Sequence, residues 1–88
     1  MIVRFDKSFE KDLKKFRDKR LISEILKQID HIKNAESINQ IVGLKKLTGF
    51  KSYYRIRIGD YRVGVFLNGD VIELIRFLHR KDIYKSFP

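Results

Sequence analysis

The apolar residues in the first part of the chain follow the period of an α-helix. Ser8 is a plausible N-cap, and apolar side chains recur at i, i+4 and i+7 in residues 9–16. A second apolar stripe with the same period occupies residues 22–32, and Asn34 can close that helix. Only a short link separates the two stripes, so the pattern predicts an antiparallel helical hairpin.

The period changes to two in the second half of the chain. Residues 52–58, 61–67 and 70–78 alternate apolar and polar side chains or are rich in β-branched and aromatic residues, which is typical of strands. Gly59-Asp60 and Asn68-Gly69 separate these segments, and both dipeptides are strong hairpin signals. The pattern predicts an antiparallel meander of three strands.

Two further segments complete the predicted fold. Residues 1–5 are rich in strand-forming side chains, whereas residues 35–50 show no sustained period and contain Gly43 and Gly49, as expected of a connection. We therefore expect a single domain over residues 1–88 with an α+β fold, in the order β-α-α-β-β-β. The helical hairpin should pack on one face of an antiparallel sheet, and the first strand should pair with an edge of the meander.

The composition excludes several classes of protein. The chain has no cysteine, so neither a disulfide framework nor a thiolate metal site can form. His31 and His79 are far apart in sequence and have no carboxylate cluster beside them, so no metal or cofactor is expected. No apolar run approaches the roughly 20 residues of a membrane span. The N-terminus lacks the apolar core of a signal peptide, and a cytoplasmic location is expected.

The charge of the chain indicates its partners. Lys and Arg number 20 against 11 Asp and Glu, which gives a net charge of +9. Residues 1–44 hold ten basic and seven acidic side chains, whereas residues 45–88 hold ten basic and only four acidic ones. This excess favours polyanions: nucleic acid first, then an acidic protein, and an anionic membrane surface last.

Three arginines share one face of the predicted central hairpin. Alternation directs the apolar side chains of residues 53–58 toward the helices, and Arg55 and Arg57 toward the opposite face. A two-residue turn brings Arg62 to that same face, where Gly64 leaves room beside the guanidinium groups. Like charges this close are unfavourable unless an anion lies between them.

The C-terminal tail can add to this row. His79, Arg80 and Tyr84 follow the last predicted strand, and the tail brings them over the open face if it folds back. Arginine forks bind phosphate bidentately, a phenol ring can stack on a base, and histidine titrates near neutrality. Such a set of side chains is suited to RNA.

Other interpretations of these residues stay open. The outward arginines can be solubility residues. His79 can be an ordinary surface or packing histidine, and Tyr84 can pack to hold the C-terminus in place. His31, on the second predicted helix, is interpreted as a surface residue.

Residues 44–84, LKKLTGFKSYYRIRIGDYRVGVFLNGDVIELIRFLHRKDIY, resemble the RelE/ParE toxin superfamily of toxin–antitoxin modules. The YRIRIGDYR hairpin and the HRKDIY tail are the specific parts, and the helical hairpin is similar too. The resemblance implies a β-α-α-β-β-β toxin held by an antitoxin segment that folds on binding. Members of the RelE branch cut mRNA in the ribosomal A site by attack of a ribose 2′-hydroxyl on the adjacent phosphate, without a metal. In the ParE branch the target is DNA gyrase, and the RNA-cutting residues are missing.

The resemblance also implies roles for the arginines of the hairpin. Arg55 and Arg57 fall where RelE-type nucleases carry basic residues, and Arg62 matches their phosphate-clamping arginine. The position of Arg57 is often a lysine in RelE itself, which can be argued to act as a base. Arginine keeps its proton and cannot readily do so.

The tail and the segment before the hairpin supply the remaining candidates. Arg80 and Tyr84 match the tail arginine and tyrosine of the family, and His79 matches an acid–base histidine of some relatives. Leu78 stands where many relatives have glycine. Further candidates for contacts with RNA phosphates are Lys45, Lys46 and Lys51.

Three functions are compatible with these observations: an mRNA endonuclease, a ParE-like inhibitor of DNA gyrase, and a basic nucleic-acid-binding module. The arginine row favours the first over the third, because a generic polyanion binder works as well with lysines scattered over every face. The expected partners are an acidic cognate antitoxin, mRNA in the ribosomal A site, and ribosomal RNA.

Overall fold

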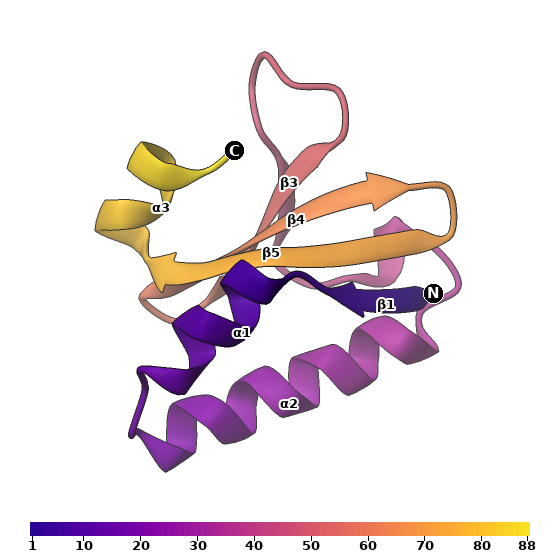
Figure 1. The fold of residues 1–88 in the computed structure, drawn as a ribbon. Coiled ribbons are helices and arrows are strands. Elements are labelled where there is room, and N and C mark those ends of the chain that lie inside the picture. Colours follow the sequence, from indigo (N-terminus) through magenta and orange to yellow (C-terminus); the bar gives the residue numbers. More distant parts are fainter.

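The computed structural model describes residues 1–88 and consists of one mixed sheet with helices on both sides (Figure 1). The elements in chain order are β1 (Ile2–Phe5), α1 (Lys7–Lys14), α2 (Lys19–Asn34), a 3₁₀ turn η1 (Ile38–Gln40), β2 (Leu44–Lys46), β3 (Tyr53–Ile58), β4 (Tyr61–Asn68), β5 (Val71–His79) and α3 (Arg80–Ser86). The strand order in the sheet is β1-β5-β4-β3-β2. The expected α+β class is confirmed.

The first strand joins the edge of the meander, as predicted, but in the parallel direction. β3, β4 and β5 form the predicted antiparallel meander, whereas β1 runs parallel to β5 with Val3 opposite Ile72. The sheet is therefore mixed, which corrects the expectation of an antiparallel one. No hairpin joins β1 to its neighbour, and without one a strand pair has no need to be antiparallel.

The segment expected to be a connection contains an additional strand. β2 pairs antiparallel with β3, and Leu44 lies opposite Ile56. Gly43, just before β2, has a φ of 82°, and a Cβ there would lie 3.1 Å from the backbone oxygen of Arg57. Three residues are too few to display an alternating pattern, so this strand had no sequence signal of its own.

The two hairpin turns both begin with a glycine of positive φ. The first turn is Gly59-Asp60, as predicted, because Ile58 pairs with Tyr61. The second turn is Gly69-Asp70, one residue later than expected, because Asn68 still pairs with Val71. A type II′ turn requires a positive φ at its first central position only, which favours glycine there. Both turns meet this requirement, because only their glycines have a positive φ.

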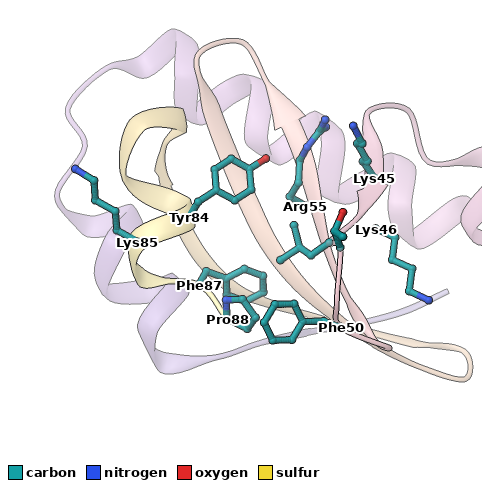
Figure 2. A pocket seen from close by; sticks show the side chains of 10 residues that line it. Lys45, Lys46, Phe50, Arg55, Tyr84, Lys85, Phe87 and Pro88 are labelled. Atoms are coloured by element: carbon teal, nitrogen blue, oxygen red, sulfur yellow. The ribbon is translucent and has the colours of Figure 1, made fainter.

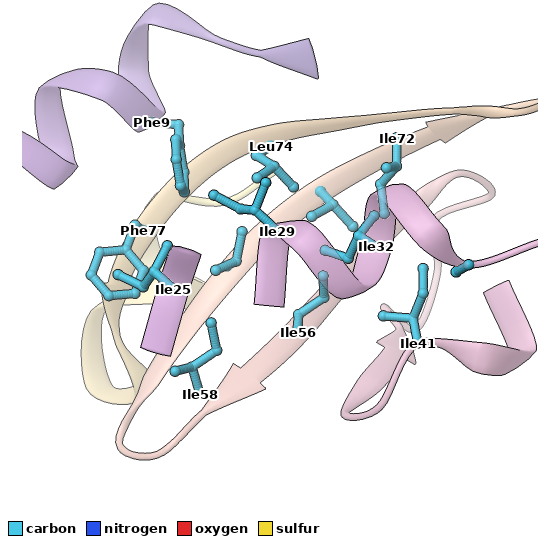
Figure 3. Close-up of a cluster of buried hydrophobic side chains, with 13 residues drawn as sticks. Phe9, Ile25, Ile29, Ile32, Ile41, Ile56, Ile58, Ile72, Leu74 and Phe77 are labelled. Atoms are coloured by element: carbon cyan, nitrogen blue, oxygen red, sulfur yellow. The ribbon is translucent and has the colours of Figure 1, made fainter. Parts of the chain in front are cut away.

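The main core lies between the sheet and the helices α1 and α2 (Figure 3). Its buried members come from α1 and α2, from the connection that follows α2, and from one face of β3, β4 and β5, and the faces predicted by alternation for β3 and β4 are confirmed. They are Phe9, Ile25, Ile29, Ile32, Ala35, Ile41, Ile56, Ile58, Val63, Val65, Ile72, Leu74 and Phe77. The prediction that the helical hairpin covers one face is confirmed. We call the other side of the sheet the open face.

The helix α3 covers part of the open face. Ile83 and Phe87 are buried there with Leu47, and together they form a second, smaller apolar cluster. Figure 1 shows α3 on the side of the sheet opposite α1 and α2. The tail therefore folds back over the open face, which is the condition for Arg80 and Tyr84 to lie near the arginine row, and it leaves this face only partly exposed.

Both N-terminal helices begin at an aspartate. The Asp6 carboxylate accepts a hydrogen bond from the Ser8 N–H at 3.0 Å, so the N-cap of α1 is Asp6 and not Ser8 as predicted. Asp18 caps α2 in the same way, by accepting from the N–H groups of Arg20 and Leu21. None of the helices combines the length and the apolar character that are needed to cross a lipid bilayer.

Candidate nucleic-acid site on the open face

Arg57 and Arg62 are direct neighbours across β3 and β4 on the open face. The Arg57 N–H donates away from β4, to the Gly43 carbonyl at 3.1 Å. Arg57 and Arg62 therefore share no backbone hydrogen bonds, and in such pairs the opposing Cα atoms are only about 4.5 Å apart. Neither side chain has a carboxylate partner. Two neighbouring arginines without a carboxylate partner favour a bound anion.

The turn between β3 and β4 brings a third arginine close to this pair. Arg62 Nη1 donates to the carbonyl oxygens of Gly59 and Tyr61, both at 2.9 Å. The backbone N–H of Arg80 donates to the Asp60 carbonyl at 2.8 Å, which ties the start of α3 to the same turn. We call Arg57, Arg62 and Arg80 the turn-end arginines.

A pocket of about 480 Å³ opens between α3 and the loop that joins β2 to β3 (Figure 2), and the turn-end arginines do not line it. We call it the basic pocket. Its lining residues are Lys45, Lys46, Leu47, Thr48, Phe50, Arg55, Tyr84, Lys85, Phe87 and Pro88. Every charged side chain in this lining is a cation, so the pocket combines positive charge with aromatic surface.

Arg55 lies between strand β2 and the pocket. Its Nη1 donates to the Gly43 carbonyl at 2.8 Å, whereas its Nε is buried without a hydrogen-bond partner. Lys45 lies directly opposite Arg55 across β2 and β3. No carboxylate pairs with either cation, so both charges are available to a ligand.

Tyr84 reaches the pocket from α3. Its neighbour Ile83 is fully buried in the second apolar cluster, whereas Tyr84 itself is 59 % exposed. The Tyr84 ring projects over the pocket, with its hydroxyl toward Arg55 (Figure 2). The structure thus brings Tyr84 and Arg55 together at the same pocket.

His79 lies on the other face of the sheet. It pairs with Tyr61 across β4 and β5 and packs against that ring edge to face, with centroids 5.3 Å apart. Tyr61 in turn packs against the main core, on the helix side. The Nδ1 of His79 accepts a hydrogen bond from the Lys81 N–H, so the side chain caps α3. The expectation that His79 joins the arginine row is corrected.

The three lysine candidates separate into two groups. Lys45 and Lys46 line the basic pocket. Lys51 is exposed in the loop between β2 and β3 but does not line the pocket. The candidate residues therefore fall into the turn-end arginines, the adjacent basic pocket, and two positions outside both, His79 and Lys51.

Sequence reasoning missed the single salt bridge of the chain. Arg76 Nε lies 2.7 Å from Asp12 Oδ2, and the Phe77 N–H donates to the same carboxylate oxygen at 3.0 Å. The hydrogen bond to Asp12 raises the pKa of Arg76 above its ordinary value, and burial only partly opposes this. Asp12 follows Phe9 at i+3, which puts it on the buried side of α1. That spacing was the available signal.

Two aromatic residues of the open face were also missed. Gly64 was expected to leave room for guanidinium groups, but the Phe87 ring occupies that space. Phe50 lines the basic pocket and is 46 % exposed. An isolated phenylalanine in a loop of irregular sequence gives no periodic signal, so its position needed the structure.

The sequence and the fold agree with one group of known proteins. The profile of the family described as "ParE toxin of type II toxin-antitoxin system, parDE" matches residues 3–84. Toxin RelE3 of Methanocaldococcus jannaschii is 44 % identical over 89 residues, with 100 % of both chains covered.

Solved structures give the same result. A chain in the RelB-RelE antitoxin-toxin complex from Methanococcus jannaschii has a TM-score of 0.81 and 42 % identity, covering 97 % of this chain and 99 % of that chain. A chain in the archaeal RelE-RelB complex from Pyrococcus horikoshii OT3 has a TM-score of 0.73 and 26 % identity, covering 93 % and 97 %. The chain described here therefore belongs to the RelE/ParE superfamily and is a toxin of the type II toxin–antitoxin class.

Proposed function

We propose that this toxin is a ribosome-dependent endoribonuclease that cuts mRNA in the ribosomal A site and thereby inhibits translation. The proposal depends on the pair Arg57 and Arg62, whose side chains lie on the open face and have no carboxylate partner. An arginine fork binds two phosphate oxygens at once, so the pair suits the phosphodiester of an RNA strand. Toxin RelE3, at 44 % identity, and the RelE chain from Methanococcus jannaschii, at 42 %, both carry the name RelE, which supports the same branch of the superfamily.

The proposed reaction is a transesterification within the RNA. The ribose 2′-oxygen attacks the adjacent phosphorus, the bond from phosphorus to O5′ breaks, and the products end in a 2′,3′-cyclic phosphate and a 5′-hydroxyl. The 2′-hydroxyl loses one proton and O5′ gains one. Negative charge accumulates on the non-bridging oxygens in the transition state, where Arg57 and Arg62 would stabilise it. Arg80 would assist the leaving oxygen.

Tyr84 is the side chain that we assign to proton transfer. A phenol can donate or accept a proton, whereas the guanidinium groups of Arg55 and Arg57 keep theirs. His79, the other candidate, packs against Tyr61 on the helix side of the sheet. The remainder of the rate enhancement would come from the ribosome, which would position the mRNA and contact the toxin through ribosomal RNA.

We also infer an acidic antitoxin as the partner of this toxin. The complexes from Methanococcus jannaschii and Pyrococcus horikoshii OT3 each contain RelE with RelB. A chain of net charge +9 with one ion pair attracts a flexible acidic segment that orders on binding.

A second candidate function is inhibition of DNA gyrase. It is favoured by one observation, the match to a family described by the name ParE. Such an inhibitor performs no chemistry on RNA, and it does not need opposed arginines on the open face.

Primer extension on cellular mRNA after brief expression separates the two functions. The comparison includes the parent, Arg57→Ala/Arg62→Ala, Tyr84→Phe, and Arg20→Ala as a matched control on the first turn of α2. We expect cleavage within codons for the parent and the control, and its loss in the double variant. Intact mRNA together with linearised DNA would instead establish gyrase as the target.

A further inference from the structure

We propose that the Phe50 ring is a stacking platform for an unpaired RNA base, with the neighbouring phosphate held by the cations of the basic pocket. The inference rests on the proposed function, because it names the subsite for the nucleotide beside the bond that is cut. It assigns a role to a residue that lies outside the turn-end arginines.

Phe50 is not required by the packing of the fold. It belongs to neither apolar cluster, and 46 % of its surface is exposed. Its contact with Tyr53 is edge to face, with ring centroids 6.0 Å apart and an angle of 89°. Tyr53 in turn contacts Phe87 at 5.5 Å. The orientation of Phe50 is therefore fixed from one side, while much of the ring remains accessible.

The surroundings of Phe50 select a nucleotide over an apolar ligand. Lys45, Lys46, Arg55 and Lys85 line the same pocket, and no side-chain carboxylate does. The volume of about 480 Å³ lies within the range of about 300–1,000 Å³ that small-molecule sites occupy. An aromatic wall beside a group of cations matches the two parts of a nucleotide, its flat base and its phosphate.

The position of the pocket fits the nucleotide next to the cleaved phosphodiester. Arg55 lines the pocket, and Arg57 lies two residues further along β3 on the same face. Two residues of a strand span about 7 Å. This is about the distance between neighbouring phosphates of an extended RNA strand, so one phosphate would lie at Arg57 and Arg62 while the adjacent nucleotide enters the pocket.

The chain has no tryptophan, so Phe50→Trp creates a single fluorescent reporter at the proposed platform. Phe5→Trp is the matched control, because Phe5 is 41 % exposed but lies on β1, at the opposite edge of the sheet. The probe is an unstructured RNA of about nine nucleotides. It carries 2′-O-methyl groups, which cannot act as the nucleophile, so binding is measured without cleavage.

We expect the RNA to quench Phe50→Trp saturably and to leave Phe5→Trp nearly unchanged. Tripolyphosphate and a hexaglutamate peptide, which carry charge but no base, should not quench either variant. Phe50→Ala should weaken RNA binding, measured by anisotropy of a labelled probe, about 5- to 100-fold. Phe50→Tyr should keep the affinity of the parent, and circular dichroism confirms that each variant is folded.

Several results would overturn the inference. They are bound RNA without quenching of Phe50→Trp, equal quenching of Phe5→Trp, and equal quenching by tripolyphosphate. Quenching by hexaglutamate alone would assign the pocket to an acidic protein segment. The proposed function is tested separately, by mRNA cleavage on ribosomes. Cleavage without quenching would reject only the stacking role of Phe50. Quenching without cleavage would reject only the nuclease function.

Discussion

The Phe87 ring lies directly over Gly64 of β4, so close that an ideal Cβ on Gly64 would be 2.7 Å from the ring. Real Cβ atoms essentially never lie this close to a non-bonded heavy atom, so a side chain at this position would force a shift. Phe87 also contacts Tyr53 at 5.5 Å and is buried in the second apolar cluster. The absence of a side chain at Gly64 is therefore what allows the end of the chain to pack on the sheet, next to the basic pocket.

Gly64→Ala should displace Phe87 and destabilise the packing of α3. We expect the free energy of unfolding, measured by urea denaturation, to fall by about 1–3 kcal/mol because the new methyl group overpacks the contact. The same substitution in a Phe87→Ala background should have a much smaller effect, since the two residues are in contact and their effects are not additive. Equal losses in both backgrounds would contradict the contact.

Asp12→Asn should destabilise the attachment of α1 to β5. The Asp12 carboxylate, only 4 % exposed, binds both Arg76 and the backbone N–H of Phe77. An amide keeps one acceptor but not the charge, so we expect a loss of about 2–3 kcal/mol in the free energy of unfolding. Asp30→Asn, at an exposed position on α2, should have almost no effect.

The loss caused by Asp12→Asn should not depend on pH near neutrality. The hydrogen bond to Asp12 raises the pKa of Arg76 in the folded protein. A raised pKa gives stability that is present below the ordinary value and is lost only as the pH rises through the raised one. The loss should therefore be the same at about pH 6 and about pH 9, and a marked difference would show that another titrating group is involved.

Arg57→Gln should increase stability slightly while it abolishes cleavage. Like charges directly opposite each other destabilise a sheet by about 0.2–1 kcal/mol, and Arg57 faces Arg62 without a carboxylate nearby. The increase in the free energy of unfolding should be clear at low salt and should shrink at high salt, where the repulsion is screened. Arg20→Gln should change neither stability nor cleavage. A destabilised Arg57→Gln protein would argue against repulsion within the pair.

His79 variants should separate a structural from a catalytic role. His79→Ala removes the cap of α3 and should lower the free energy of unfolding by about 0.5–2 kcal/mol. His79→Asn retains a capping side chain and should cut mRNA at nearly the parental rate. Complete loss of cleavage in a well-folded His79→Asn protein would instead identify His79 as part of the reaction.

The sequence was sufficient to predict which side chains of the central hairpin lie on each face of the sheet, because two physical requirements agreed there. The apolar side chains of β3 and β4 had to face the helices, and the Gly59-Asp60 turn fixed the register that put Arg57 opposite Arg62. The place of Tyr84 did not follow in the same way, because the sequence left open whether the tail folds back over the sheet.

The position of His79 was predicted wrongly because the last strand was ended one residue too early. β5 continues to His79, and alternation through Phe77 and Leu78 directs the histidine to the helix side. The salt bridge between Asp12 and Arg76 joins residues far apart in sequence. Contacts of this kind depend on how α1 meets the sheet, which no local pattern encodes.

The position of Asp12 has a consequence for contacts between molecules. β1 ends at Phe5, so beyond this residue β5 would present free backbone groups to any neighbouring chain, but Asp12 takes the Phe77 N–H. The sheet then ends in β1 and β2, which are only four and three residues long. Such short edge strands offer few backbone groups with which a strand of another molecule can pair. The protein is therefore protected against edge-to-edge aggregation.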